Sequence, residues 1–302
     1  MKISKSVANL LLLLVTIMWG STYILNKMVV EAGMQSGTIN AVRGAMCVTA
    51  GIILFHHQLK KVTWFDIKIG LIVGLVNFCG YYLRTLGLRY TTPAKSSFIT
   101  VTYVVLTPLV LWLFWHERPQ FKIIFAIPLS LLGMAIITGL NLQHWTLQSG
   151  DFITFLSAFF WAFQIIIFGK YASHASSPWI ILILIGMVQV LCGTPVALLT
   201  ERQSLMAINW GQALIPLAII AIVITFAARG IQIYAQGFTD ATSASLILMT
   251  ESFFASATSI LFGYDHLSWN LIIGGALILL GNIIMQVNFK PKIGRQTPEE
   301  VQ

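Results

Sequence analysis

The sequence predicts an all-α integral membrane protein with ten transmembrane helices, arranged as two inverted five-helix repeats with both termini in the cytoplasm. Three observations lead to this fold class: the composition, a series of apolar runs of membrane-spanning length, and a long internal repeat. The 302 residues are 57% hydrophobic and 9% charged, with a mean hydropathy of +0.83. A water-soluble globule of this length needs far more polar surface.

Ten apolar runs are separated by short polar breaks. Each is about 20 residues long, which is the length that a helix rising 1.5 Å per residue needs to cross roughly 30 Å of hydrocarbon. In chain order the predicted spans are Val7–Val30, Gly37–Phe55, Ile67–Leu88, Pro93–Trp115, Ile123–Leu140, Phe152–Lys170, Pro178–Leu199, Ala213–Gln236, Ala241–Gly263 and Leu267–Val287.

The fourth and fifth spans return in the ninth and tenth. Thr91–Ile136 matches Thr239–Ile284 at a constant offset of 148 residues, in one register through both apolar runs and the acidic turn between them. Matching pairs include Ile99 with Ile247, Thr102 with Thr250, Phe114 with Phe262, Leu132 with Leu280 and Gly133 with Gly281. This indicates duplication. We therefore divide the chain into a first repeat (1–146), a second repeat (147–290) and a disordered cytoplasmic tail (291–302).

The distribution of Lys and Arg predicts the orientation. With a cytoplasmic N-terminus, the inner segments hold eleven of these residues and the outer loops hold three, namely Arg89, Lys95 and Arg202. Five helices per repeat is an odd number, so the second repeat is inserted upside down relative to the first. Inverted repeats of this kind build carriers that open alternately to either side of a midplane site.

Several segments resemble a known family. They are WGSTYILNK (Trp19–Lys27), Arg43 early in the second span, LGLRYTTPAKSSFI (Leu86–Ile99) and TESFFASATSILFGYDHLSWNLIIGGALILLGNII (Thr250–Ile284). Together they resemble the drug/metabolite transporter superfamily, specifically its ten-helix EamA-type branch, over almost the whole chain. The resemblance implies an inverted-repeat carrier that moves amino acids or other small metabolites, usually outward, across the cell membrane.

Five ionisable side chains lie within the predicted spans: Lys27, Arg43, Arg84, Arg229 and Glu251. Such a group costs several kcal/mol in hydrocarbon, so each should face the bundle interior, a water-filled cavity or a partner. Lys27 and Arg84 lie near span ends, where long side chains can also reach the interface. Glu251 could form a buried pair with Arg229, or it could exchange a proton or contact a substrate ammonium group.

Polar residues spaced by three, four or seven positions share a helix face. Such stripes comprise Asn77, Tyr81 and Arg84; Ser96, Thr100, Tyr103 and Thr107; and Thr225, Arg229, Gln232 and Gln236. Ser and Thr in such stripes also commonly bond their own backbone, and Trp also anchors at the interface. The predicted substrate-binding residues are Trp19, Tyr23, Arg43, Asn77, Tyr81, Arg84, Tyr103, Trp161, Gln164, Arg229 and Gln232, with Glu251 as the proton-coupling residue.

Other function classes find little support. Cys47, Cys79 and Cys192 are isolated, and the histidines lie in or near connections without an HExxH motif, so neither a metal, a cofactor nor an enzyme is expected. The cations form no basic stripe for nucleic acid. We expect a multi-pass carrier in the cell membrane, surrounded by lipid and binding a small molecule, as a monomer or homodimer. Its substrates would be amino-acid-like solutes that it exports or exchanges; a multidrug or lipid-like exporter is the alternative, ahead of a non-transporting subunit or an enzyme.

Overall fold

The computed structural model describes residues 3–117, 121–138, 148–171, 175–236, 238 and 247–286, and within these ranges the regular secondary structure is helical. The helices of the first half are α1 (Lys5–Glu31), α2 (Ser36–Leu59), α3 (Trp64–Gly87), α4 (Pro93–Val101), α5 (Tyr103–Trp115) and α6 (Ile123–Thr138). Those of the second half are α7 (Ser149–Tyr171), α8 (Pro178–Thr200), α9 (Arg202–Leu205), α10 (Trp210–Ala218), the π-helix η2 (Ile219–Ala227), α11 (Ala228–Gln236), α13 (Glu251–Leu261) and α14 (Trp269–Gln286).

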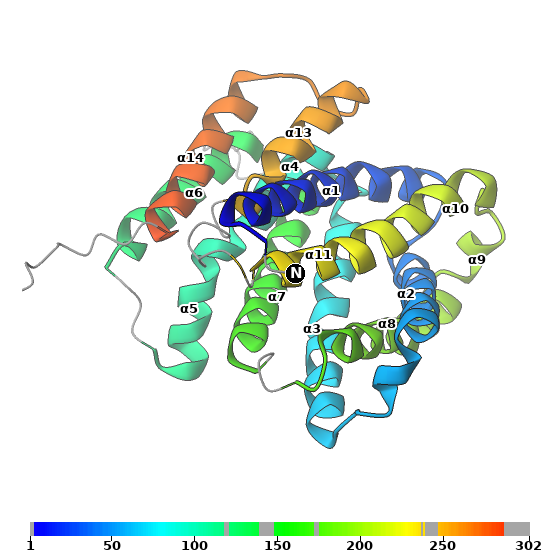
Figure 1. Ribbon diagram of the computed structural model, residues 1–302. Coiled ribbons are helices and arrows are strands. Elements are labelled where there is room, and N and C mark those ends of the chain that lie inside the picture. The colour runs from blue at the N-terminus through cyan, green and yellow to red at the C-terminus, as the bar shows by residue number, and fades with distance from the viewer. Residues whose placement is uncertain are drawn as a thin grey trace, which may run out of the picture.

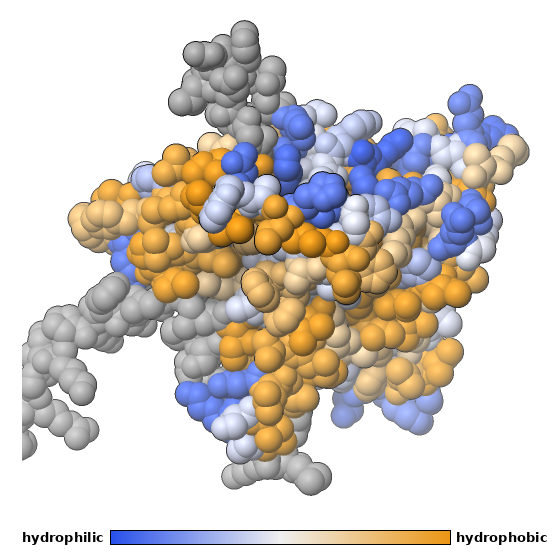
Figure 2. Space-filling view, turned by 90° about the horizontal axis from the view of Figure 1, so that it is seen from above, coloured by the Kyte–Doolittle hydropathy of each residue, from blue (hydrophilic) through white to orange (hydrophobic). Residues whose placement is uncertain are grey.

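The chain is an all-helical, multi-pass membrane protein. Within the part of the chain that the structure describes, seven helical segments are long and apolar enough to cross a membrane, and two shorter apolar helices cover Ile123–Ile137 and Trp269–Ile284. Hydrophobic residues cover much of the face in Figure 2, and hydrophilic residues gather toward its upper right and its lower rim. The count of ten stays a prediction, since Ile123–Leu140, Ala241–Gly263 and Leu267–Val287 lie partly outside the described residues. The predicted tail lies wholly outside them, and the orientation also stays a prediction.

Short polar side chains set the starts of several helices. Thr63 and Asp66 form a reciprocal capping box at α3, and the hydroxyls of Thr92 and Ser177 accept backbone N–H bonds at α4 and α8. Both α4 and α8 begin with a proline, whose missing N–H costs nothing in the first turn of a helix. These two starts agree with the predicted spans that begin at Pro93 and Pro178.

Helices of the two halves cross in matching pairs. In Figure 1, α2 crosses α8 and α6 lies along α14, while α3 packs against α7 and α1 packs against α11 and α13. The first two pairs meet through glycines: a Cβ on Gly44 would lie 2.7 Å from the Gly186 carbonyl oxygen, and one on Gly274 would lie 2.6 Å from that of Gly133. Only the absence of side chains permits backbones to approach this closely.

Both halves interrupt the same helix at the same place. Thr102 separates α4 from α5, and its hydroxyl donates to the Ile99 carbonyl at 2.6 Å. Thr250, 148 positions later, precedes α13 and donates to the Ile247 carbonyl, also at 2.6 Å. A hydroxyl bonded back onto the preceding turn bends a helix. Directly after these threonines, α5 and α13 each begin inside a predicted span, with Tyr103 and Glu251 as their first residues.

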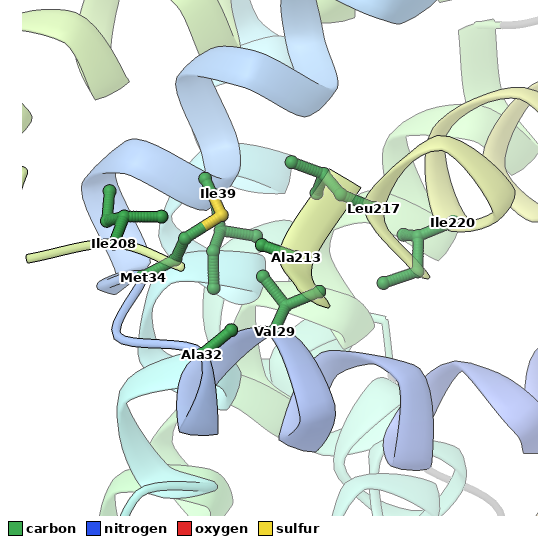
Figure 3. Packing of buried hydrophobic residues seen from close by; sticks show 8 residues of the cluster. All are labelled: Val29, Ala32, Met34, Ile39, Ile208, Ala213, Leu217 and Ile220. Carbon is green, nitrogen blue, oxygen red and sulfur yellow. The ribbon is translucent and has the colours of Figure 1, made fainter. Parts of the chain in front are cut away.

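An apolar cluster and hydrogen bonds join the helices at the end of the bundle where α1 finishes. The cluster joins the end of α1 and the start of α2 to α10 and η2, and its buried members are Val29, Ala32, Met34, Ile39, Ile208, Ala213, Leu217 and Ile220 (Figure 3). Beside it, the buried Glu201 carboxylate accepts bonds of 2.7–2.8 Å from the backbone N–H groups of Gly37 and Thr38. Lys27 donates to the Leu88 carbonyl at 2.8 Å, at the end of α3.

Candidate functional site

A cavity of about 290 Å³ lies between the two halves of the bundle. Helices α1, α3, α4 and α5 line it from the first half, and α7, η2, α11 and α13 line it from the second. The lining residues are Trp19, Thr22, Tyr23, Tyr81, Arg84, Thr100, Tyr103, Val104, Thr107, Trp161, Gln164, Ile165, Ile224, Arg229, Gln232, Leu248 and Glu251. The volume is at the lower end of the range for small-molecule sites, so the cavity suits a small solute.

Arg84 occupies an aromatic cage on the first-half side of the cavity. Its guanidinium carbon lies 4.7 Å from the ring centre of Tyr81, 5.0 Å from that of Tyr23 and 5.4 Å from that of Trp161. Only 7% of the residue is exposed. Arg84 therefore does not extend to the membrane interface, which was one alternative for a long side chain near the end of a span; the rings instead hold its charge at the cavity wall.

The second half contributes a cation and the carboxyl group. Arg229 on α11 donates to the side-chain oxygen Oε1 of Gln232 at 3.2 Å and lies 4.9 Å from the Trp19 ring centre. Glu251 is 7% exposed and occupies the first turn of α13, where the positive end of the helix dipole favours an acid. The guanidinium charges of Arg84 and Arg229 act on it electrostatically. Both residues are described, and no salt bridge joins Glu251 to Arg229, so the buried pair considered from the sequence does not form.

A chain of three amides runs from the protein interior to the cavity. Gln189 on α8 donates its amide N–H to Asn77 Oδ1 at 2.6 Å, and Asn77 donates to Gln164 Oε1 at 2.8 Å. Gln164 lines the cavity, whereas Asn77 and Gln189 lie behind it and are 3% and 1% exposed. Because the acceptor of Gln164 is already used, its N–H donors are the groups left to face a solute.

The cavity brings together all the predicted site residues except Arg43 and Asn77. Arg43 lies behind Tyr81, 3.5 Å from its ring centre, and donates to Asn40. Thr100 and Thr107 reach the cavity, but their hydroxyls donate to carbonyls of the preceding turn, which is the backbone-bonding alternative. Solute binding by these residues stays a prediction.

Sequence reasoning missed Gln189 and part of the cavity lining. Gln189 is the one amide within the apolar predicted span Pro178–Leu199, and a lone amide in such a span is a usable signal for a buried polar contact. The missed lining residues are Thr22, Val104, Ile165, Ile224 and Leu248. The four apolar ones resemble any lipid-facing residue in the sequence.

Comparison with protein families decides the identity of the fold. The model of the EamA-like transporter family matches residues 6–139 and, a second time, residues 148–286. The chain belongs to the EamA-like transporter family. The two matched segments correspond to the two halves that contribute to the cavity, and the resemblance seen in the sequence is confirmed.

Relatives of this EamA-like chain agree with that assignment. An uncharacterized transporter from Archaeoglobus fulgidus is 29% identical over 285 residues, which cover 94% of this chain and 87% of that protein. A protein of known crystal structure superposes with a TM-score of 0.58 and 15% sequence identity, covering 93% of this chain and 96% of the other. At that identity the likeness is one of fold. The EamA-like protein is thus a membrane transporter.

Proposed function

We propose that this EamA-like protein carries small amino-acid-like solutes across the cell membrane by alternating access, as an exporter or exchanger that is either secondary active or facilitative. The observation that supports this most strongly is the cavity between the halves, where the Glu251 carboxyl group, the guanidinium groups of Arg84 and Arg229 and several aromatic rings meet. Groups of both charge signs beside apolar rings complement a solute that carries an ammonium group, a carboxylate and an apolar side chain.

Glu251 is the group that can respond to the ammonium or to a proton. Its carboxyl group lies at the start of a helix inside the bundle and has no salt-bridge partner among the described residues. A buried carboxylate without an ion-pair partner is costly, so a solute ammonium group or a proton would stabilise it. Exchange of one for the other would couple solute movement to a proton gradient.

Alternating access is consistent with the way the halves meet. At the glycine crossings between α2 and α8 and between α6 and α14, the backbones of the two halves touch directly. At the end where α1 finishes, the apolar cluster and Glu201 join α1 and α2 to segments of the second half, so a rocking motion that opens the cavity there would separate this cluster. One chain supplies both halves of the cavity, which makes a monomer a sufficient transport unit, and a homodimer would contain two such units.

The aromatic lining also favours a second candidate, the export of multidrug or lipid-like compounds. Trp19, Tyr23, Tyr81, Tyr103 and Trp161 all line the cavity, and aromatic faces bind organic cations and flat apolar rings. This candidate would make no use of a carboxylate on the solute.

Counterflow in proteoliposomes loaded with a mixture of amino acids and related organic acids tests the proposal. Wild type should exchange particular solutes saturably, and Glu251→Gln should lose the pH dependence of exchange between two pH values. Glu31→Gln is the matched control, because Glu31 bonds Tyr264 at 2.6 Å and does not line the cavity. Exchange of hydrophobic cations without amino acids would favour the second candidate, and an unchanged pH dependence in Glu251→Gln would exclude coupling through Glu251.

A further inference from the structure

Three side chains at one wall of the cavity hold buried polar atoms without a hydrogen-bond partner among the described residues. They are Nε and Nη2 of Arg84, Nε1 of Trp161 and the hydroxyl oxygen of Tyr23. Arg84 and Trp161 can only donate, and the Tyr23 hydroxyl can donate as well. All three residues line the cavity, and the rings of Tyr23 and Trp161 lie within 5.4 Å of the Arg84 guanidinium carbon.

The two unpartnered atoms of Arg84 belong to the same edge of its guanidinium group. The N–H bonds of Nε and Nη2 run parallel along this edge, and their spacing matches the two oxygens of a carboxylate. The aromatic rings around Arg84 further restrict how the group can turn. The free edge is therefore held in a geometry that can donate two parallel hydrogen bonds to a planar oxyanion.

The charges around this edge also favour the binding of an anion. Arg43 lies 3.5 Å from the ring centre of Tyr81 on the side away from the cavity, so the region holds two guanidinium groups. Glu251 is the carboxyl group that lines the cavity, and it makes no salt bridge with Arg84. A buried cation without an ion-pair partner destabilises the protein, and a bound oxyanion would offset that cost.

Arg229 is a poorer candidate for the same role. It donates to Gln232 at 3.2 Å, and none of its nitrogen atoms is buried without a partner. We propose that the free edge of Arg84, with the indole N–H of Trp161 and the hydroxyl of Tyr23, forms the subsite for the carboxylate of the transported solute. This assignment rests on the proposed function, and it leaves Glu251 for the ammonium group.

Binding of a simple acid and its amide separates the subsite from transport. Phenylacetate and phenylacetamide share an aromatic ring and a similar size, and only the acid presents two equivalent anionic oxygens. Titrated into purified, detergent-solubilised protein and followed by ligand-induced thermal stabilisation, phenylacetate should bind at least about tenfold more tightly than the amide, since charge-assisted pairs are the stronger hydrogen bonds.

Three variants test whether the preference for the acid over the amide arises at Arg84. Arg84→Met should bring the acid-to-amide ratio to about one, and Arg84→Lys, which keeps the charge without the two parallel N–H donors, should retain only part of the preference. Arg202→Met, at an exposed arginine of α9 that does not line the cavity, is the matched control and should keep the wild-type ratio. Size-exclusion chromatography verifies that each variant is folded. If Arg84→Met does not fold, the acid-to-amide ratios of wild type and of Arg84→Lys decide whether Arg84 forms the subsite.

Several outcomes would overturn the subsite. Wild type could bind acid and amide equally, or Arg229→Met could abolish the preference while Arg84→Met keeps it. Inorganic phosphate or chloride that displaced phenylacetate at equal concentration would assign the site to a free anion instead of a solute carboxylate. A clear acid preference at Arg84 together with no amino-acid counterflow would support the subsite and refute the proposed function, so the two failures are distinguishable.

Discussion

Replacing Gln189 with methionine should weaken solute binding through a residue that does not line the cavity. Methionine has a similar volume and adapts to its surroundings, but it cannot donate the 2.6 Å bond to Asn77 Oδ1. Asn77 then lacks the anchor that orients its own 2.8 Å bond to Gln164. Gln164 would no longer hold its N–H donors toward the solute.

The size of the effect follows from the groups involved. Removing a donor from a buried acceptor costs about 1–3 kcal/mol of stability, and we expect the lower end, since Gln189→Met also removes the buried Oε1, which has no partner. Loss of one neutral hydrogen bond to the solute, worth about 0.5–1.5 kcal/mol, raises the half-saturating concentration about 2- to 12-fold. Thermal unfolding measures the first quantity and counterflow the second.

A double-mutant cycle tests the reasoning. If Gln189 acts through Gln164, Gln189→Met should leave the half-saturating concentration unchanged in a Gln164→Met background, although it should still lower stability there. A second loss of affinity of the same size in that background would refute the amide chain. Gln212→Met, on the exposed first turn of α10, is the control and should change neither quantity.

Three further predictions concern the helix contacts and the end of the bundle where α1 finishes. Gly274→Leu should lower the free energy of unfolding by about 1–3 kcal/mol, because its Cβ would meet a carbonyl oxygen of α6 at 2.6 Å. Gly211→Ala is the control, since the atom nearest to its added Cβ lies at 3.4 Å. Equal losses of stability in the two variants would contradict the close crossing of α6 and α14. Glu201→Ala should cost at least about 1.5–3 kcal/mol in thermal unfolding, since it removes charge-assisted bonds to the start of α2; an unchanged unfolding temperature would refute this. Burial and the Glu31 carboxylate raise the pKa of Tyr264 to about 12. Tyr264→Phe should therefore leave the tyrosine absorbance change near pH 10 in an ultraviolet titration as large as in wild type. A smaller absorbance change near pH 10 in the variant would contradict the contact between Tyr264 and Glu31.

Hydropathy and duplication were sufficient to predict the class of the fold. Membrane-spanning helices must satisfy their own backbone groups, so apolar runs of fixed length leave few alternatives. The breaks at Thr102 and Thr250 could not be predicted, because neither is marked by a neighbouring proline or glycine and threonine is common within membrane helices. Their hydroxyl bonds to Ile99 and Ile247 do not mark them either, since Thr16 makes the same kind of bond to the Leu13 carbonyl within the unbroken helix α1.

Charge predicted the cavity only in part. Of the five ionisable side chains within the predicted spans, Arg84, Arg229 and Glu251 line the cavity, whereas Lys27 and Arg43 do not. Helical spacing correctly associated Asn77 with the polar face of α3, but it could not show that the amide chain places this residue behind Gln164. Apolar lining residues such as Ile224 and Leu248 carry no signal, since lipid and cavity walls favour the same side chains.

The central claim is that solutes cross the membrane through the cavity between the halves. Val104→Trp places a bulky ring in the cavity lining, whereas Val223→Trp places the same ring on η2, where the valine is 43% exposed. Counterflow should be abolished in folded Val104→Trp protein and retained in Val223→Trp. Undiminished exchange by Val104→Trp would contradict the claim and require another path for the solute.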